Sequence, residues 1–210
     1  TSMSGGDLSI RGLPSVENDF GFFVRDRYNN FSDTLFLTAT PWPESELDKK
    51  RFSDFDNPTW SFVWGVYDGV VEWGNYSFIT TPYDFPHYMN IDLGVLAKLS
   101  RMKIWQRVGD DTLFQHGMPK SWRMYGKSDM AQAEWTLLME CNSFKPSGLP
   151  IGQYSTEDWE YAEAGEEFMF PLDAEPVRYL RFEFLSTWGG YKGTAFSEFS
   201  VWGEVIDNAN

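Results

Sequence analysis

Three loops of the sequence combine large aromatic rings with side chains that form directional hydrogen bonds. They cover residues 57–74, 107–120 and 186–195. A sugar packs the C–H groups of its apolar face on Trp or Tyr rings, and its hydroxyl groups need charged or amide partners. This chemistry makes the loops candidates for carbohydrate binding. The residues that would contact the sugar are Trp64, Tyr67, Arg107, His116, Trp188 and Tyr191.

Each candidate also has a structural alternative. Most aromatic rings of a protein this rich in them belong to the core. Arg107 could instead form a salt bridge under a sheet, and His116 could hold its own loop by a hydrogen bond. The sequence leaves these alternatives open.

Charge limits the class of ligand. The chain has 210 residues with 17 Lys and Arg against 31 Asp and Glu, a formal net charge of −14. Such an acidic surface repels phosphate backbones and anionic lipid headgroups, which argues against nucleic acid. It permits neutral sugars and calcium. No run of apolar residues is long enough to span a membrane.

The sequence offers little for catalysis. Cys141 is the only cysteine, and His87 and His116 are the only histidines, so zinc spacing is absent. There is no G-x-S-x-G motif, and "GGYKG" lacks the spacing of a phosphate-binding loop. Glycoside hydrolysis needs two facing carboxylates, but among 31 acidic residues such pairs carry no weight. We therefore expect a protein that is not an enzyme.

Short alternating segments position these loops. Residues 19–28 and 33–40 are strand-like and flank the turn sequence "YNNFSD", which predicts a β-hairpin. The proline- and charge-rich stretch that follows predicts a boundary. The rest alternates in short runs with turn residues between them, apart from "STEDWEYAEAG", which predicts a helix capped by Ser155 or Thr156 and ended by Gly165. This pattern is typical of an all-β sandwich or barrel.

The last two runs, residues 177–185 and 196–202, alternate most regularly, and we expect them to pair as the closing strands. Gly189, Gly190 and Gly193 would let the loop between them fold back tightly. Whether the rings of Trp188 and Tyr191 in this loop point outward or inward is left open.

Four segments keep the order of a known family: "YDGVVEWGNY", "MNIDLG", "KSWRMYGKSD", and the pair "VRYLRFEF" and "FSEFSVWGE". In this respect the sequence resembles the discoidin, or factor 5/8 type C, family of galactose-binding-like jelly rolls. The resemblance implies an all-β jelly-roll sandwich over residues 54–210, preceded by a linker over residues 47–53.

Details such as "HGMPKSW", "KPSGLP" and "EAGEEFMFP" resemble the C-terminal domain of Bacteroidetes surface lipoproteins. "DRYNNFSDTLFLTATPWPE" resembles the end of the immunoglobulin-like or fibronectin-III-like domain that precedes it there. Residues 1–46 would then be the last strands of such a domain, and the chain would start inside a longer protein. The resemblance implies a cell-surface or periplasmic location, with a lipid anchor outside this chain.

The resemblance also implies a structural calcium ion, because many members hold one between the Asp-Gly loop and the last strand. Asp68 and Glu198 match those positions. "DGVVEW" lacks the Asp or Asn and the Thr that usually precede the Trp, so expected ligands are missing here.

Together these observations predict a non-catalytic carbohydrate-binding module of a bacterial surface glycan-utilisation lipoprotein. Its ligand would be a neutral sugar. The alternative is a protein-interaction or structural spacer module without a glycan site, since one fold supports both functions. Nothing in the sequence specifies the oligomeric state.

Overall fold

The computed structural model describes residues 10, 13–71, 77–79, 83–107 and 112–206. The chain divides into two units between Pro43 and Glu44. Within the described residues, no helix has the length and apolar character needed to cross a membrane.

The first unit contains the predicted hairpin. β1 (Asn18–Phe22) and β2 (Leu35–Ala39) pair antiparallel. The turn is longer than predicted, because β1 ends at Phe22 and Asp26, expected in the strand, belongs to the turn: its carboxylate accepts hydrogen bonds from the backbone N–H groups of Tyr28 and Asn30 at 2.7 and 2.9 Å. Every residue of β2 is exposed. That these strands end an immunoglobulin-like domain stays a prediction.

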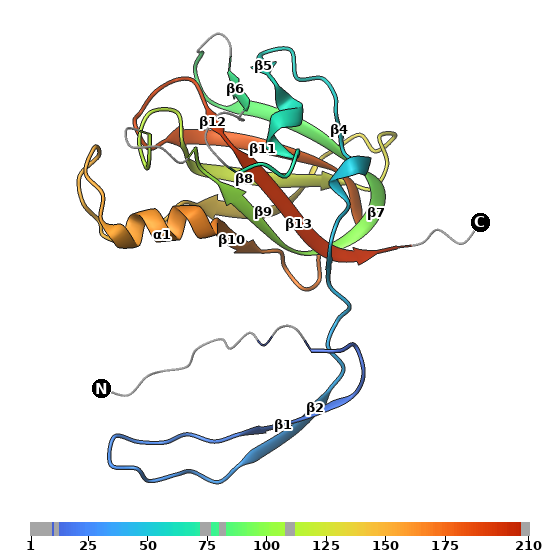
Figure 1. Ribbon diagram of the computed structural model, residues 1–210. Coiled ribbons are helices and arrows are strands. Elements are labelled where there is room, and N and C mark those ends of the chain that lie inside the picture. The colour runs from blue at the N-terminus through green and yellow to red at the C-terminus, as the bar shows by residue number, and fades with distance from the viewer. Residues whose placement is uncertain (1–9, 11–12, 72–76, 80–82, 108–111, 207–210) are drawn as a thin grey trace. The chain divides into compact units, whose positions relative to one another are not determined.

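The second unit is a β-sandwich, as predicted (Figure 1). Its large sheet has the strand order β3-β13-β7-β11-β8-β9, with β10 and β4 also paired to β7. The small sheet has the order β12-β6-β5 and covers one face of the large sheet. The strands are β3 (Ser45–Glu46), β4 (Ser53–Asp54), β5 (Trp60–Ser61), β6 (Ser77–Ile79), β7 (His87–Trp105), β8 (Pro119–Lys127), β9 (Thr136–Asn142), β10 (Glu166–Met169), β11 (Val177–Thr187), β12 (Ala195–Phe196) and β13 (Glu198–Val205).

The core lies between the two sheets and combines aliphatic side chains with a cluster of aromatic rings. Trp60 of β5 packs on Phe184 of β11 and Phe196 of β12, with ring centroids 5.7 and 6.3 Å apart. Phe182 and Phe199 add an edge-to-face pair at 5.2 Å. Many of the rings counted in the sequence therefore stabilise the sandwich, as the structural alternative supposed.

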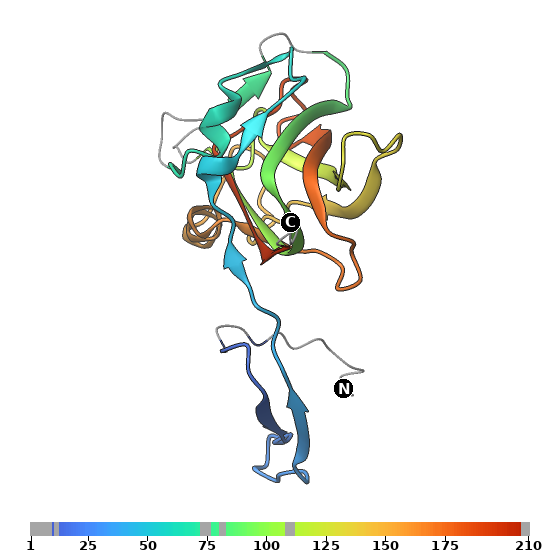
Figure 2. The ribbon, with the colours of Figure 1, turned by 90° about the vertical axis from the view of Figure 1, so that its right-hand side faces the viewer.

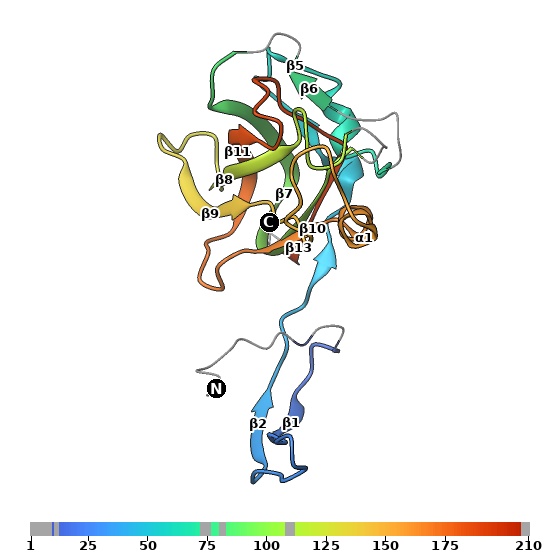
Figure 3. The same ribbon diagram turned by 90° about the vertical axis from the view of Figure 1, so that its left-hand side faces the viewer.

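The helices are short. α1 (Thr156–Ala164) confirms the predicted helix: Ser155 and Asp158 form a reciprocal capping box, and Gly165 follows with φ of 79°. It lies beside β10 at the edge of the large sheet (Figure 3). The two 3-10 turns are η1 (Lys49–Arg51) and η2 (Val63–Val66).

The position of β7 shows that one prediction, the pairing of the last two strands, is wrong. β11 and β13 do not pair with each other as closing strands, because β7 lies between them and pairs with both. "HYMNIDLG" is not a separate strand either, since β7 continues to Trp105 and curves strongly along its length (Figure 2). Gly94 permits the bend: its φ is 70°, and a Cβ there would lie 2.4 Å from the backbone oxygen of Arg51.

The expected linker over residues 47–53 is also part of the sandwich. β3 pairs with β13, and β4 pairs with β7. Leu47 and Phe52 join the core with exposed fractions of 3% and 7%. The charges of this stretch suggested a solvated linker, but its two apolar residues anchor it to the sandwich.

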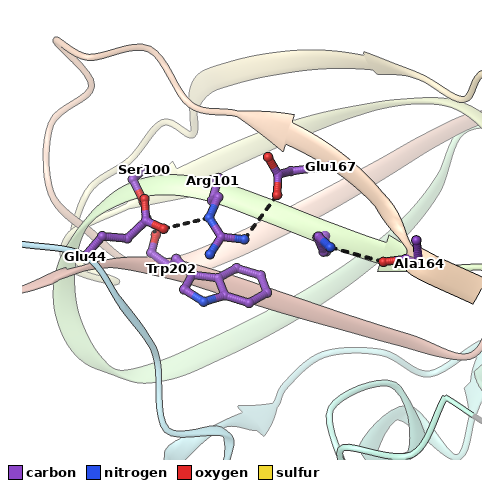
Figure 4. A network of polar contacts seen from close by, with 7 residues as sticks. Glu44, Ser100, Arg101, Ala164, Glu167 and Trp202 are labelled. Atoms are coloured by element: carbon purple, nitrogen blue, oxygen red, sulfur yellow. Dashed lines mark hydrogen bonds and ion pairs between the residues drawn. The ribbon is translucent and has the colours of Figure 1, made fainter. Parts of the chain in front are cut away.

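A polar network holds the start of the sandwich (Figure 4). Glu44 accepts hydrogen bonds from Arg101 Nε at 2.6 Å and from Ser100 Oγ at 2.9 Å. Arg101 also bonds Glu167 at 3.2 Å, and its guanidinium lies 3.7 Å from the centroid of the Trp202 ring. Because Arg101 has two carboxylate partners, its charge is compensated within the fold.

Candidate functional site

Three residues predicted from the sequence meet at one hollow of the sandwich. This hollow, called the Trp64 pocket below, has a volume of about 610 Å³ and lies between the segment around η1 and the segment around η2. Its lining residues are Glu46, Leu47, Asp48, Lys49, Lys50, Phe52, Trp64, Tyr67 and Asp68. The pocket thus combines aromatic rings with carboxylates and ammonium groups.

Trp64 presents its ring at this pocket. It lies in η2 with an exposed fraction of 54%, beside Phe62, which is 59% exposed. The two rings meet edge to face, with centroids 6.3 Å apart and an interplanar angle of 90°. Phe62 has φ of 55°, an uncommon backbone conformation for a bulky residue. The main chain therefore accepts strain at the place where two large apolar side chains face solvent.

Tyr67 packs against the core, whereas Trp64 is exposed. Its ring packs edge to face on Phe52 and Phe199, at 6.0 and 6.5 Å. Its hydroxyl donates a hydrogen bond to Asp54 at 3.3 Å. Burial, together with the negative charge of Asp54, raises the pKa of Tyr67 to about 12. Tyr67 therefore forms a wall of the pocket and stays protonated.

A buried ion pair lies beside the pocket. Lys49 Nζ is 2.8 Å from Oε1 of Glu198, whose side chain is 1% exposed. The other carboxylate oxygen of Glu198 accepts a hydrogen bond from Gly69 N at 2.9 Å. Burial raises the pKa of Glu198 to about 7, although Lys49 and Gly69 oppose this shift.

These contacts do not fit the implied calcium ion. Calcium takes six to eight oxygen ligands. Both oxygens of Glu198 already accept from nitrogen donors, and Asp68 is exposed and accepts from Val70 N at 2.8 Å in its own turn. The described residues contain no cluster of three or more His, Cys, Asp or Glu side chains that could hold a metal. The calcium site stays a prediction without support from these groups.

The other predicted residues belong to a second group of loops. The loops around His116 and Trp188 are joined by backbone hydrogen bonds, from Trp188 N to Met118 O at 2.9 Å and from Gly189 N to His116 O at 3.0 Å. A Cβ at Gly189 would lie 2.3 Å from the His116 backbone nitrogen, so glycine is what permits this close approach.

Trp188 points inward at this loop pair. Its ring packs edge to face on buried Phe114 with centroids 5.4 Å apart, and its Nε1 donates to Ser143 Oγ at 2.9 Å. The ammonium group of Lys120 lies 5.0 Å from the ring centroid. Trp188 therefore helps to form a small second core with Leu113 and Phe114.

Tyr191 and His116 are exposed, whereas Arg107 is half-buried. Tyr191 has an exposed fraction of 55%, and its backbone oxygen accepts from Thr187 Oγ1 at 2.7 Å. The backbone N–H of Arg107 lies 3.3 Å from Met118 Sδ. Residues 108–111 of the same loop lie outside the described residues, as does Trp73 of the first loop.

Sequence reasoning missed one further hollow, on the outer face of the large sheet. It has a volume of about 250 Å³. Its lining residues are Asp56, Pro58, Thr59, Tyr83, Tyr88, Asn90 and Arg181. The sequence showed only that residues 177–185, which include Arg181, alternate regularly. It could not show that β7 would place Tyr88 and Asn90 beside them.

Two family models match the sequence. DUF5000, described as a domain of unknown function, matches residues 66–203. DUF5126, also described as a domain of unknown function, matches residues 1–50. A comparison with curated proteins finds no match.

Solved structures are more informative. SusE-like protein BT2857 is 33% identical to this chain, with a TM-score of 0.75, and the alignment covers 94% of this chain and 80% of that one. A fragment of a putative chitobiase from Bacteroides thetaiotaomicron is 19% identical, with a TM-score of 0.57 over 78% of this chain and 95% of that one. A family 32 carbohydrate-binding module from a Clostridium perfringens glycoside hydrolase is 15% identical, with a TM-score of 0.56 over 76% and 95%.

The structural matches confirm the galactose-binding-like sandwich that the resemblance implied. The expectation of a non-catalytic protein agrees with these matches, because the 33% identical relative is named a SusE-like protein and the structure that shares the fold is a carbohydrate-binding module. By the extent of these matches, the chain belongs to the DUF5000 family and to the SusE-like proteins.

Proposed function

We propose that the chain is a non-catalytic carbohydrate-binding module of a bacterial surface glycan-utilisation lipoprotein. The relationship to a SusE-like protein supports this role. The fold does so as well, since a family 32 module of the same fold from Clostridium perfringens was solved in complex with galactose. That likeness, at 12% identity, concerns the fold and leaves the ligand of this chain to be determined.

The observation that carries the proposal is the exposed ring of Trp64 at a pocket with charges of both signs. Asp48 and Lys50, both exposed, line the same pocket. The apolar face of a sugar ring would pack on Trp64, while its hydroxyl groups would donate to Asp48 and accept from Lys50. The net charge of −14 favours a neutral glycan.

The pocket is open, so a single contact area of this kind gives weak binding. Linkage to neighbouring modules would raise the effective affinity. A lipid anchor outside this chain would hold the protein at the cell surface. Fractionation of producing cells, with protease accessibility of intact cells as the readout, tests the location: protection from protease would contradict a surface position.

A glycan array with the whole chain tests the function. We expect binding to a neutral glycan at millimolar affinity or better, and weaker binding in Trp64→Ala, because the contact with the Trp64 ring is lost. Trp42→Ala is a matched control, because Trp42 is 46% exposed and lies in the other unit. If no glycan binds above background, the protein-interaction or spacer alternative replaces this proposal.

A further inference from the structure

The outer face of β7 and β11 carries a row of polar side chains. Tyr88 lies opposite Glu183 in the strand pair, and Asn90 lies opposite Arg181. The intervening Met89 is fully buried on the core side, so the row faces away from the core. The 250 Å³ hollow lies on this face, between these strands and the segment around Asp56. It is smaller than the roughly 300–1,000 Å³ that enclose a drug-sized ligand.

Arg181 is held in a defined position at this hollow. Its Nε donates to Oδ1 of Asn90 at 2.7 Å, and Asn90 is only 2% exposed. The backbone oxygen of Asp56 accepts from the Asn90 amide at 3.1 Å, which fixes the amide. The Arg181 guanidinium lies 4.3 Å from the ring centroid of Trp135 and 5.4 Å from that of Tyr88. A planar group stacked in this way loses little freedom when it binds a ligand.

Within the part of the chain that the structure describes, the terminal amino groups of Arg181 have no acceptor. Among the described residues, neither an ion pair nor a hydrogen bond engages its Nη atoms. Burial lowers the pKa of Arg181, as expected for a cation without a carboxylate in contact. The other arginines of the sheet differ: Arg101, Arg123 and Arg178 each form an ion pair with a carboxylate. Arg181 thus offers donors that nothing in the described fold satisfies.

Asp56 supplies a hydrogen-bond acceptor at the same hollow. Its exposed carboxylate lines the same hollow and accepts no hydrogen bond from any described residue. It is near enough to favour the charged form of Arg181, yet it does not form an ion pair with it. Asp56 has φ of 51°, a left-handed conformation that Asp tolerates better than most residues. The hollow therefore has donor-only groups and an acceptor-only group that leave each other unsatisfied.

A hydroxyl group can both donate and accept, which suits such a pair. An added carboxylate or phosphate would be attracted by Arg181 but repelled by Asp56. Tyr88, which is 40% exposed and whose hydroxyl donates to Glu183 at 2.9 Å, offers an aromatic ring for the apolar face of a sugar. We propose that this hollow is a second sugar-binding site, in which Arg181 and Asp56 recognise two adjacent hydroxyl groups of one neutral sugar. This site goes beyond the proposed function, because it lies at different residues and does not depend on Trp64.

Nuclear magnetic resonance of the full chain tests the site. The Nε–H signal of Arg181, assigned by its disappearance in Arg181→Gln, is followed during titration with methyl galactoside, methyl mannoside and galacturonic acid. We expect a saturable shift with a neutral sugar and a weaker response to the acid. Asp56→Asn introduces a residue that tolerates the same backbone conformation. It should lower the affinity for the neutral sugar by about tenfold or more, since a hydrogen bond to a charged group is lost.

Arg123→Gln is the control on the same sheet, because Arg123 is already paired with Glu140. It should leave sugar binding unchanged, and Trp64→Ala should leave the Arg181 shift unchanged. The proposal is overturned if no sugar shifts the Arg181 signal, or if Asp56→Asn leaves the affinity for the neutral sugar unchanged. If Trp64→Ala removes the Arg181 shift, there is one site rather than two, and the proposed function stands alone. If sugars shift the Arg181 signal while Trp64→Ala changes no sugar binding at all, the Trp64 pocket is not a binding site. The site at Arg181 is then supported without it.

Discussion

The ammonium group of Lys49 lies 2.8 Å from the carboxylate of Glu198, a residue that the family resemblance assigned to a calcium ion. The lysine places a positive charge beside this buried carboxylate. Lys49 reaches this place because the segment between β3 and β4, which was predicted to be a linker, packs on the sandwich. The pair joins the first and last parts of the sandwich.

Calcium removal is therefore expected to have no effect on stability. Thermal unfolding is followed in excess calcium and in excess chelator. We expect equal midpoints, because Glu198 has no oxygen free of a nitrogen donor. A higher midpoint with calcium than with chelator would restore the calcium prediction.

Removal of the lysine should be costly. Lys49→Met leaves the buried Glu198 carboxylate without its partner, and we expect a loss of about 3–5 kcal/mol in the free energy of unfolding. Lys50→Met is the control, because Lys50 is exposed and should change stability by about 0.5 kcal/mol or less. Urea titration of the three proteins measures both effects. Equal losses in the two variants would show that the ion pair does not matter.

Glu166 should make stability depend on pH. Burial raises its pKa from 4.5 to about 7 in the folded protein, despite hydrogen bonds from Phe144 N, Ser143 and Tyr161. Because the folded state holds this proton more tightly than the unfolded state, the contribution is complete below pH 4.5 and is lost as the pH rises to about 7. The difference amounts to about 3 kcal/mol.

Glu166→Gln removes this titration and keeps an oxygen for the Phe144 N–H. Relative to the unchanged protein, the variant should therefore gain stability between pH 4.5 and pH 8, as measured by urea unfolding at both values. Glu160→Gln, at an exposed position of α1, should follow the unchanged protein. Parallel behaviour of both variants would contradict the assignment to Glu166.

The two predicted tryptophans should respond differently to substitution. Trp188→Ala removes a ring packed on Phe114 and a hydrogen bond to Ser143, and should cost about 2 kcal/mol or more in unfolding free energy. Trp64→Ala removes an exposed ring and should cost about 0.5 kcal/mol or less while it removes glycan binding at the Trp64 pocket. Calorimetric unfolding together with the glycan array separates the two roles. A stable Trp188→Ala that loses glycan binding would return Trp188 to the ligand site.

Most of the local structure could be predicted from the amino-acid sequence. Alternation set the strands, the turn residues around Asp26 set the hairpin, and Ser155 and Gly165 set the two ends of α1, because each of these signals acts between residues close in the chain. The sandwich fold could be predicted because four sequence segments occur in the same order as in the discoidin family.

Contacts between residues far apart in the chain could be known only from the folded structure. β7 separates the two strands that looked like a closing pair, and it brings Asn90 to Arg181. Lys49 reaches Glu198 across 149 positions of the chain. The ring of Trp188 turns inward because Phe114 and Ser143 lie beneath it, while Trp64 stays exposed. Residue types and spacing do not encode such long-range pairs, because strand order and the packing of loops depend on the whole core rather than on neighbours in the sequence.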